Sequence, residues 1–241
     1  LKDGAHILDV GGESTKPGAD IVSADVELAR VVPVIEALSR KFPGAIISVD
    51  TYKAVVAQAA LDAGAHIIND VWGFKADPDM ASLAADRGVP VMLMHNKSKP
   101  GHAEIDARLG GAYIAPDYSN FLSEVRAEMK GLADNALAAG VKADQIILDP
   151  GVGFGKTVQQ NMMLINHLDE FKALGYPILL GSSRKSFIGK VLNVEADQRV
   201  EGTAATVALG VARGADIVRV HDVKEMGRIV RMMDALLCAE G

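Results

Sequence analysis

Short apolar runs rich in β-branched residues alternate along the chain with longer segments whose apolar positions recur every three or four residues. Seven such runs are typical of buried strands, at residues 6–12, 45–51, 66–73, 89–96, 145–154, 177–185 and 215–222. The segments between them predict amphipathic helices, most clearly at 26–42, 52–64, 120–140 and 200–214. Near-continuous apolar strands that alternate with helices indicate a parallel sheet covered by helices.

The number of strands favours an α/β fold of the eight-stranded (β/α)8 TIM-barrel type. The chain begins with Leu1 rather than methionine and reaches its first strand within five residues. We therefore expect one barrel domain over residues 1–241, with the first strand and its loop missing from the N-terminus. A doubly wound open sheet is the alternative, although no G-x-G-x-x-G turn follows the first strand present.

Each predicted strand ends in residues too polar for a core. They are Asp9 and Glu13, Asp50, Asn69 and Asp70, His95 and Asn96, Asp149, Arg184 and Lys185, and Arg219 and His221. In a parallel barrel these ends meet on one face, which is where active sites of this architecture lie. We therefore expect one site built from all seven strand ends.

Two kinds of group stand at this predicted rim. Asp50, Asn69 and Asp149 are short carboxylate and amide side chains that suit the edge of a polar heterocycle. The cations are Lys16, Lys156, Arg184, Lys185, Arg219 and His221. Local positive charge in a chain of net charge −6 suggests an anionic substrate or leaving group.

Net charge, cysteine content and the absence of certain motifs exclude several classes of protein function. The net charge of −6 argues against general binding of nucleic acid or anionic membranes. Cys238 is the only cysteine, which excludes an internal disulfide and is consistent with a cytoplasmic protein. There is no apolar run of about 20 residues, no zinc-protease motif, no G-x-S-x-G elbow and no P-loop spacing.

Seven stretches, in chain order, carry a family resemblance: GGESTKPGA, SVDTYK, IINDVWG, LMHN, LDPGVGFGKT, SSRKSFIG and RVHDV. Together they closely resemble the dihydropteroate synthases, which are the sulfonamide targets of folate synthesis. The resemblance extends from about residue 6 to the last helix. It implies a TIM barrel that joins 6-hydroxymethyl-7,8-dihydropterin diphosphate to 4-aminobenzoate, with Mg²⁺ as cofactor, pyrophosphate as leaving group and a homodimer as assembly.

The same resemblance implies roles for individual residues. It assigns the pterin to Asp50, Asn69, Met94, Asp149, Lys185 and Arg219. It assigns the diphosphate to Gly12, Thr15, Arg219 and His221. It assigns 4-aminobenzoate, with which sulfonamides would compete, to Thr15, Lys16, Pro17, Phe154, Lys185 and Ser186. The catalytic roles implied are those of Lys185, Asp149, Arg219 and His221, and the expected Mg²⁺-linked asparagine would lie in the missing N-terminal segment.

Two positions depart from the family pattern, because the family commonly has arginine at Lys16 and threonine at Ser182. Lysine keeps the charge but loses the planar fork, so we expect looser anion contact at Lys16. We expect Arg184 to be either a structural salt bridge or a support for the site. We also expect the connection at 97–120 to be a mobile rim loop, and the helix at 202–214 to form the subunit interface.

Three alternatives remain open at this point. A pterin-binding methyltransferase would share the ring-binding Asp and Asn positions, but gives no reason for cations at Lys185 and His221. The missing first strand leaves room for a pterin-binding protein that catalyses poorly or not at all. A non-pterin phosphate-binding barrel would have to treat Asp50, Asn69 and Asp149 as accidental.

Overall fold

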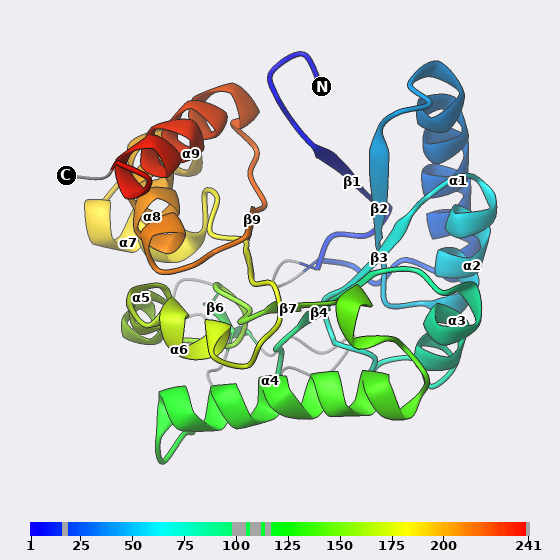
Figure 1. Cartoon of the computed structure of the whole chain (residues 1–241), viewed down its shortest axis with the longest axis horizontal. Helices are drawn as coiled ribbons and strands as arrows, with labels where there is room; N and C mark the ends of the chain where they lie inside the picture. Colours follow the sequence, from blue (N-terminus) through cyan, green and yellow to red (C-terminus); the bar gives the residue numbers. More distant parts are fainter. Residues whose placement is uncertain (16–18, 98–104, 107–111, 114–116, 240–241) are drawn as a thin grey trace.

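All seven predicted strands are present and parallel in the computed structural model, which describes residues 1–15, 19–97, 105–106, 112–113 and 117–239. Five of them form a sheet in the order β1-β2-β3-β4-β7 (Figure 1). Their bounds are β1 Ile7–Gly11, β2 Ile46–Asp50, β3 Ile67–Asp70, β4 Val91–Met94 and β7 Ile146–Asp149. A bridge between Leu148 and Ile178 continues this array to β8 (Leu179–Leu180), which pairs with β9 (Ile217–Val218).

The helices lie outside the strands and follow them in sequence, as Figure 1 shows. They are α1 Ala24–Lys41, α2 Ala54–Asp62, α3 Met80–Arg87, α4 Phe121–Ala138, α5 Val158–Asn166, α6 Leu168–Lys172, α7 Ser186–Leu192, α8 Val200–Ala212 and α9 Val223–Leu237. Two short 3₁₀ turns lie at Ala143–Gln145 and Ala196–Gln198. The four clearest predicted helices correspond to α1, α2, α4 and α8.

Local chemistry sets several of these boundaries. Ser23 caps α1 by accepting a hydrogen bond from the Val26 amide, and Thr157 forms a capping box with Gln160 at the start of α5. Gly88 ends α3 with a φ of 61°, a left-handed conformation that glycine adopts without strain. These caps set where α1 and α5 begin and where α3 ends.

Most of the connection at 97–120 lies outside the described residues, so its predicted mobility stays a prediction. The part that is described forms a small antiparallel pair between β5 (Ile105–Asp106) and β6 (Ala112–Tyr113). No helix in the described part of the chain is long and apolar enough to cross a membrane.

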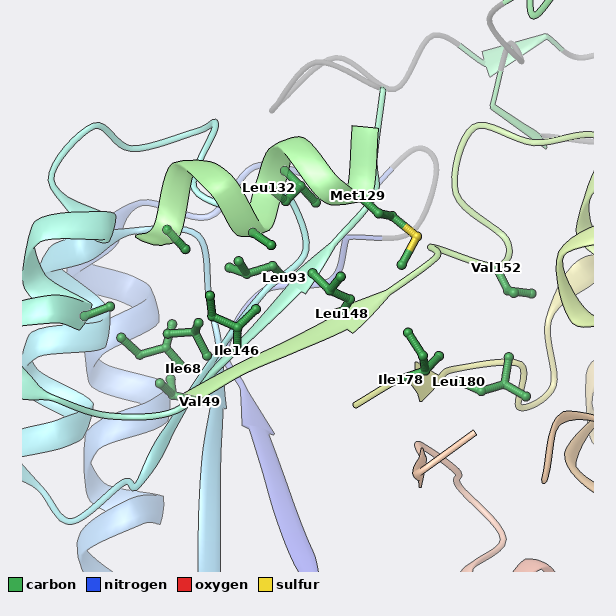
Figure 2. Close-up of a cluster of buried hydrophobic side chains, with 14 of the residues drawn as sticks. Val49, Ile68, Leu93, Met129, Leu132, Ile146, Leu148, Val152, Ile178 and Leu180 are labelled. Carbon is green, nitrogen blue, oxygen red and sulfur yellow. The ribbon is translucent and has the colours of Figure 1, made fainter. Parts of the chain in front are cut away.

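Two apolar layers lie on opposite faces of the strands. The outward-facing residues pack beneath the helices, where Met129 and Leu132 of α4 lie over the strands (Figure 2). The strand residues drawn in that layer are Val49, Ile68, Leu93, Ile146, Leu148, Ile178 and Leu180. The inward-facing residues form a second, smaller cluster composed of Ile7, Ile67, Met92, Ile147, Leu179 and Ile217.

The inner cluster settles the choice between a barrel and an open sheet. Ile7 of β1 and Ile217 of β9 pack on the same small cluster, although these strands stand at opposite ends of the strand order. An open sheet would hold its two outermost strands far apart, so the array must curve around this interior. The fold is an α/β barrel of the TIM type. The strand predicted before Leu1 stays a prediction.

Candidate active site

The candidate site, which we call the pocket, is the set of inward-facing residues one step beyond the inner apolar cluster, and on β2 one step beyond the inward-facing Ser48. Side chains of a strand alternate between faces, so the residue two positions after an inward-facing one also points inward. The inward positions that follow the inner cluster at the carboxyl ends of the strands are Asp9, Asp50, Asn69, Met94, Asp149, Gly181 and Arg219. The strand register sets Asp50 beside Asn69, and Met94 beside Asp149. The barrel therefore brings together the carboxylate and amide groups that the sequence singled out.

Arg219 joins the two ends of the strand order across this pocket. Its Nε donates to Asp9 Oδ2 at 2.6 Å, and its Nη2 donates to Asp50 Oδ2 at 2.8 Å. Asp9 also accepts hydrogen bonds from Ser48 Oγ at 2.5 Å and from Asn69 Nδ2 at 3.2 Å. Asp9 is thus the centre of the network. The sequence marked it as a polar strand end but gave it no role.

The carboxylates of the pocket differ from ordinary surface carboxylates in their pKa values. Burial and the neighbouring Asp9 carboxylate raise the pKa of Asp50 to about 7, and the guanidinium of Arg219 offsets part of this rise. Burial also raises the pKa of Asp149, although its Oδ1 accepts the Gly151 amide at 2.7 Å. The pocket therefore holds one carboxyl group, that of Asp50, that binds or releases a proton near neutral pH, next to a half-exposed arginine.

Lys185 lies at the mouth of the pocket. Its Nζ is 4.1 Å from the centroid of the Phe154 ring, a cation–π contact. Its stem packs over Gly153, where a Cβ would lie 2.8 Å from the Lys185 Cδ and where φ is +85°. Phe154 in turn packs on an apolar group that includes Trp72 and Met94. A flat aromatic wall with an ammonium above it therefore borders the carboxylates.

The stretch after β8 holds the next predicted residues. Ser183 Oγ lies 2.9 Å from His221 Nδ1 and accepts the His221 amide at 3.1 Å, so the two loops are tied together. Arg184 forms a two-point ion pair with Asp222, which leaves its guanidinium facing that carboxylate rather than the pocket. Ser186 begins α7 and is exposed.

Lys156 does not belong to the rim, which corrects the expectation from sequence. Its side chain is buried, and its Nζ donates to three backbone carbonyls: Gly151 and Phe154 at 2.9 Å each, and His95 at 3.3 Å. The ammonium therefore holds the turn that follows β7 instead of facing a ligand.

Asp70 and His95 also point away from the pocket, because each follows an inward-facing residue and therefore faces outward, toward the helices. Asp70 accepts hydrogen bonds from the amides of Trp72 and Phe74, which closes the turn after β3. His95 is fully buried and places Nε2 at 2.8 Å from Glu128 on α4. The expectation that every polar strand end joins one site is therefore wrong for these two residues.

The glycine-rich turn after β1 places Gly12 and Thr15 on the same face of the barrel as Asp9. Gly12 is buried against α1, where a Cβ would lie 2.8 Å from both Glu27 Cγ and Val31 Cγ2. Thr15 is half-buried. Lys16 and Pro17 lie outside the described residues, so their predicted contacts stay predictions.

Because His95 is buried, we expect the folded protein to lose stability at acidic pH. Burial lowers the pKa of His95 from 6.5 to about 4, despite the contact with Glu128. Between these values the unfolded chain binds a proton that the folded chain does not. The free energy of unfolding should therefore fall as the pH drops from about 6.5 to about 4, by up to about 1.4 kcal/mol per pH unit from this group. Urea unfolding at several pH values measures that slope.

The His95→Gln variant isolates this contribution, because other groups titrate equally in both proteins. We expect a shallower slope for His95→Gln than for the parent, and no change in slope for the control His167→Gln, whose side chain is exposed. Parallel slopes for the parent and His95→Gln would show that His95 is not the acid-sensitive group.

Comparison with known proteins identifies similar chains over nearly the whole length. The family model described as pterin binding enzyme matches residues 1–221. The dihydropteroate synthase of Bacillus subtilis is 50% identical over 237 residues, which cover 98% of this chain and 77% of that protein.

Solved structures give the same result. The dihydropteroate synthase of Clostridium difficile, crystallised in the presence of pteroic acid, superposes with a TM-score of 0.89 and 46% identity, covering 98% of this chain and 83% of that one. A Yersinia pestis dihydropteroate synthase with a sulfonamide drug complex gives a TM-score of 0.91 and 40% identity, covering 99% and 83%. A Xanthomonas albilineans dihydropteroate synthase with 4-aminobenzoic acid superposes with a TM-score of 0.90 and 38% identity. The match covers 99% of this chain and 82% of that one.

Proposed function

The chain belongs to the pterin binding enzyme family, among the dihydropteroate synthases, and we propose that it joins 6-hydroxymethyl-7,8-dihydropterin diphosphate to 4-aminobenzoate. The products are 7,8-dihydropteroate and pyrophosphate, in a step of folate biosynthesis. The observation that carries this proposal is the pocket in which Arg219 bridges Asp9 and Asp50 beside Asn69 and Asp149. It offers hydrogen-bonding groups to a heterocycle and a cation to the group that leaves it.

The pterin would lie among the inward-facing polar side chains. A pterin edge carries N–H donors and ring acceptors, which match the carboxylates of Asp50 and Asp149 and the amide of Asn69. Met94 would supply an apolar contact, and Lys185 and Arg219 would lie along the ring. Arg219 is half-exposed, so its guanidinium can move toward a ligand without crossing the core.

The reaction begins with departure of the diphosphate. The bond between the pterin methylene carbon and the diphosphate oxygen breaks, and the electron pair leaves on oxygen. Arg219 and His221, together with the turn from Gly12 to Thr15, would stabilise the negative charge on the leaving group. The carboxylates of Asp50 and Asp149 would stabilise the cationic pterin that remains. The aromatic amine then forms the C–N bond and loses a proton to water, so no protein base is required.

The 4-aminobenzoate would lie on the aromatic wall. Phe154 provides a flat apolar surface, and the ammonium of Lys185, 4.1 Å from the centroid of that ring, would contact the substrate lying there. Thr15, Lys16, Pro17 and Ser186 complete the proposed contacts, with the substrate carboxylate at Ser186. Sulfonamides resemble this substrate and would compete for the same surface.

We propose Mg²⁺ as a companion of the diphosphate rather than as a resident ion of these residues. Within the described ranges there is no group of three or more His, Cys, Asp or Glu that could hold a metal. Magnesium bound through phosphate oxygens needs few protein ligands, and it would supply additional positive charge to the leaving group.

We further propose that the chain acts in the cytoplasm as one domain and as a homodimer. An apolar groove between α5, α7 and α8, lined by residues that include Met162, Phe187 and Leu209, supports the predicted interface near residues 202–214. Sedimentation equilibrium of the purified protein tests the assembly.

The experiment that tests the function measures pyrophosphate release from the pterin diphosphate, with and without 4-aminobenzoate, in the presence of Mg²⁺. The protein should be expressed from its complete gene. Release coupled to dihydropteroate formation is expected. Measurable pterin binding without release would contradict the proposal and favour a pterin-binding methyltransferase or a binding protein.

Replacing Lys185 by alanine should lower kcat/KM by about a hundredfold, because it removes the one side chain proposed to contact both the pterin ring and 4-aminobenzoate. The control is Lys190→Ala, because Lys190 is an exposed lysine on α7, the helix that begins just after Lys185. Steady-state kinetics with both substrates varied measures the change. Full turnover by Lys185→Ala would count against the assigned role.

A further inference from the structure

Tyr52 and Lys53 lie two and three residues after the end of the pterin-side strand β2, and the proposed chemistry does not use them. Lys53 is the N-cap residue of α2, and its Nζ forms ion pairs with two glutamates from different elements. One is Glu13, in the turn after β1. The other is Glu27 on α1, at 2.5 Å. The side chains of Lys53, Glu13 and Glu27 are 16%, 8% and 1% exposed, so the triad is shielded from water.

Glu13 ties its own turn to its surroundings with both carboxylate oxygens. Its Oε2 pairs with Lys53, and its Oε1 accepts hydrogen bonds from the Tyr52 hydroxyl at 3.1 Å and the Val22 amide at 3.2 Å. Because Val22 lies nine residues further along, this carboxylate joins the two ends of the segment that follows β1. That segment contains Thr15.

Helix α1 packs against the start of the same segment. Arg30 Nη1 donates to the Gly12 carbonyl at 2.8 Å, and the Gly12 Cα packs directly against Glu27 and Val31. A fully buried carboxylate such as Glu27 is costly unless a cation pairs with it, and Lys53 is that cation. Although burial lowers it, the hydrogen bonds to the two glutamates raise the pKa of Lys53, which keeps the ammonium charged.

We propose that the triad of Glu13, Lys53 and Glu27 is a positioning device that fixes the segment with Thr15 relative to Asp50. Lys53 stands three residues after Asp50, so the pterin side of the pocket and the aminobenzoate side share one buried ion pair. This inference rests on the proposed function, in which Thr15 contacts 4-aminobenzoate. Because the triad holds the segment with Thr15, it should determine the affinity for 4-aminobenzoate and for sulfonamides more than the affinity for the pterin. Lys53 touches no substrate; it acts through Glu13.

The test compares Lys53→Met and Glu13→Gln with the parent. Lys53→Met removes the charge but keeps the length of the side chain, and Glu13→Gln keeps the shape of the carboxylate. We expect KM for 4-aminobenzoate and the inhibition constant of a sulfonamide to rise about tenfold or more, as for a misplaced binding group. KM for the pterin diphosphate should change much less. Lys53→Arg keeps the cation and should recover most of the loss.

The control is Lys130→Met, which breaks an exposed ion pair with Asp134 on α4 and should leave both KM values unchanged. Equal increases in both KM values for Lys53→Met, or no increase in either, would overturn the proposal, because a purely structural role makes no distinction between the two substrates.

A second measurement does not depend on turnover. Amide hydrogen exchange over residues 12–15 and 19–22, which include the Val22 amide bound by Glu13, should accelerate about tenfold or more in Lys53→Met, while the middle of α1 exchanges as in the parent. Unchanged exchange in this segment would refute the positioning role even if the protein catalysed a different reaction. An inactive parent with accelerated exchange in the variant would instead reject only the proposed function.

Discussion

Replacing Arg219 by methionine should lower kcat/KM by about a thousandfold, because one guanidinium serves three charged partners in turn. In the free protein it neutralises Asp9 and Asp50. In the reaction it would meet the departing diphosphate. Methionine keeps much of the length but none of the charge, so the loss reports electrostatics rather than an empty space. Steady-state kinetics with the pterin diphosphate varied gives the value.

The pH dependence of the same variant distinguishes its role from a simple loss of binding. Burial and Asp9 raise the pKa of Asp50 to about 7, and Arg219 opposes that rise. Without Arg219 the pKa of Asp50 should be higher still, so its carboxyl stays protonated at neutral pH. The acidic limb of the kcat/KM profile should move to higher pH. An acidic limb in the same place as in the parent would show that Asp50 is not the group that Arg219 tunes.

A control for Arg219→Met is Arg213→Met. Arg213 is exposed at the end of α8, and its Nη2 donates to Asn166 Oδ1 at 3.2 Å. The Arg213→Met substitution removes one positive charge, as Arg219→Met does, but at a site outside the pocket. We expect its kinetics to match the parent within experimental error.

Replacing Lys156 by methionine should lower the free energy of unfolding by about 3 kcal/mol, because three backbone carbonyls lose their shared donor. Those carbonyls belong to Gly151, Phe154 and His95, and methionine fills the space without offering a hydrogen bond. Denaturant unfolding measures the loss. Lys172→Met, which breaks an exposed pair with Asp216, is the control and should cost about 1 kcal/mol or less.

The pH dependence of the Lys156 effect has a defined sign. Burial lowers the pKa of Lys156 from 10.5 to about 7. Below pH 7 the folded protein holds a charged, poorly solvated ammonium, and this cost disappears as the pH rises toward the unfolded pKa. The stability that Lys156 contributes therefore increases from pH 7 upward. The difference between parent and Lys156→Met should be larger at pH 9 than at pH 7, and a difference that shrinks would contradict this account.

Strand positions, the main helices and most of the pocket follow from sequence pattern because they depend on local information. An apolar run with a polar end identifies a strand and its exit, and parallel topology then places Asp50, Asn69 and Asp149 on one face. The short helices α3 and α6 were not predicted, because eight and five residues give little room for a helical period.

The direction of individual side chains could not be predicted for a different reason. Strands covered on both faces are apolar at every position, so they lack the alternation that would reveal which residues face inward. Asn69 and Asp70 are adjacent in sequence, yet one lines the pocket and the other closes a turn. The role of Asp9 depends on Arg219, which lies 210 positions away, and no local pattern carries that information.

A one-residue slip of any strand would exchange the contents of pocket and core. If β3 shifted by one position, Ile68 would enter the pocket, and Asn69 would be driven among the apolar side chains beneath the helices. Misregistered chains would therefore lose ligand binding together with packing. A pterin ligand present during refolding at a hundred times its Kd would favour the correct register by about 2.7 kcal/mol. Binding capacity would then measure the quality of the refolded protein more sensitively than helix content, which a slipped strand leaves nearly intact.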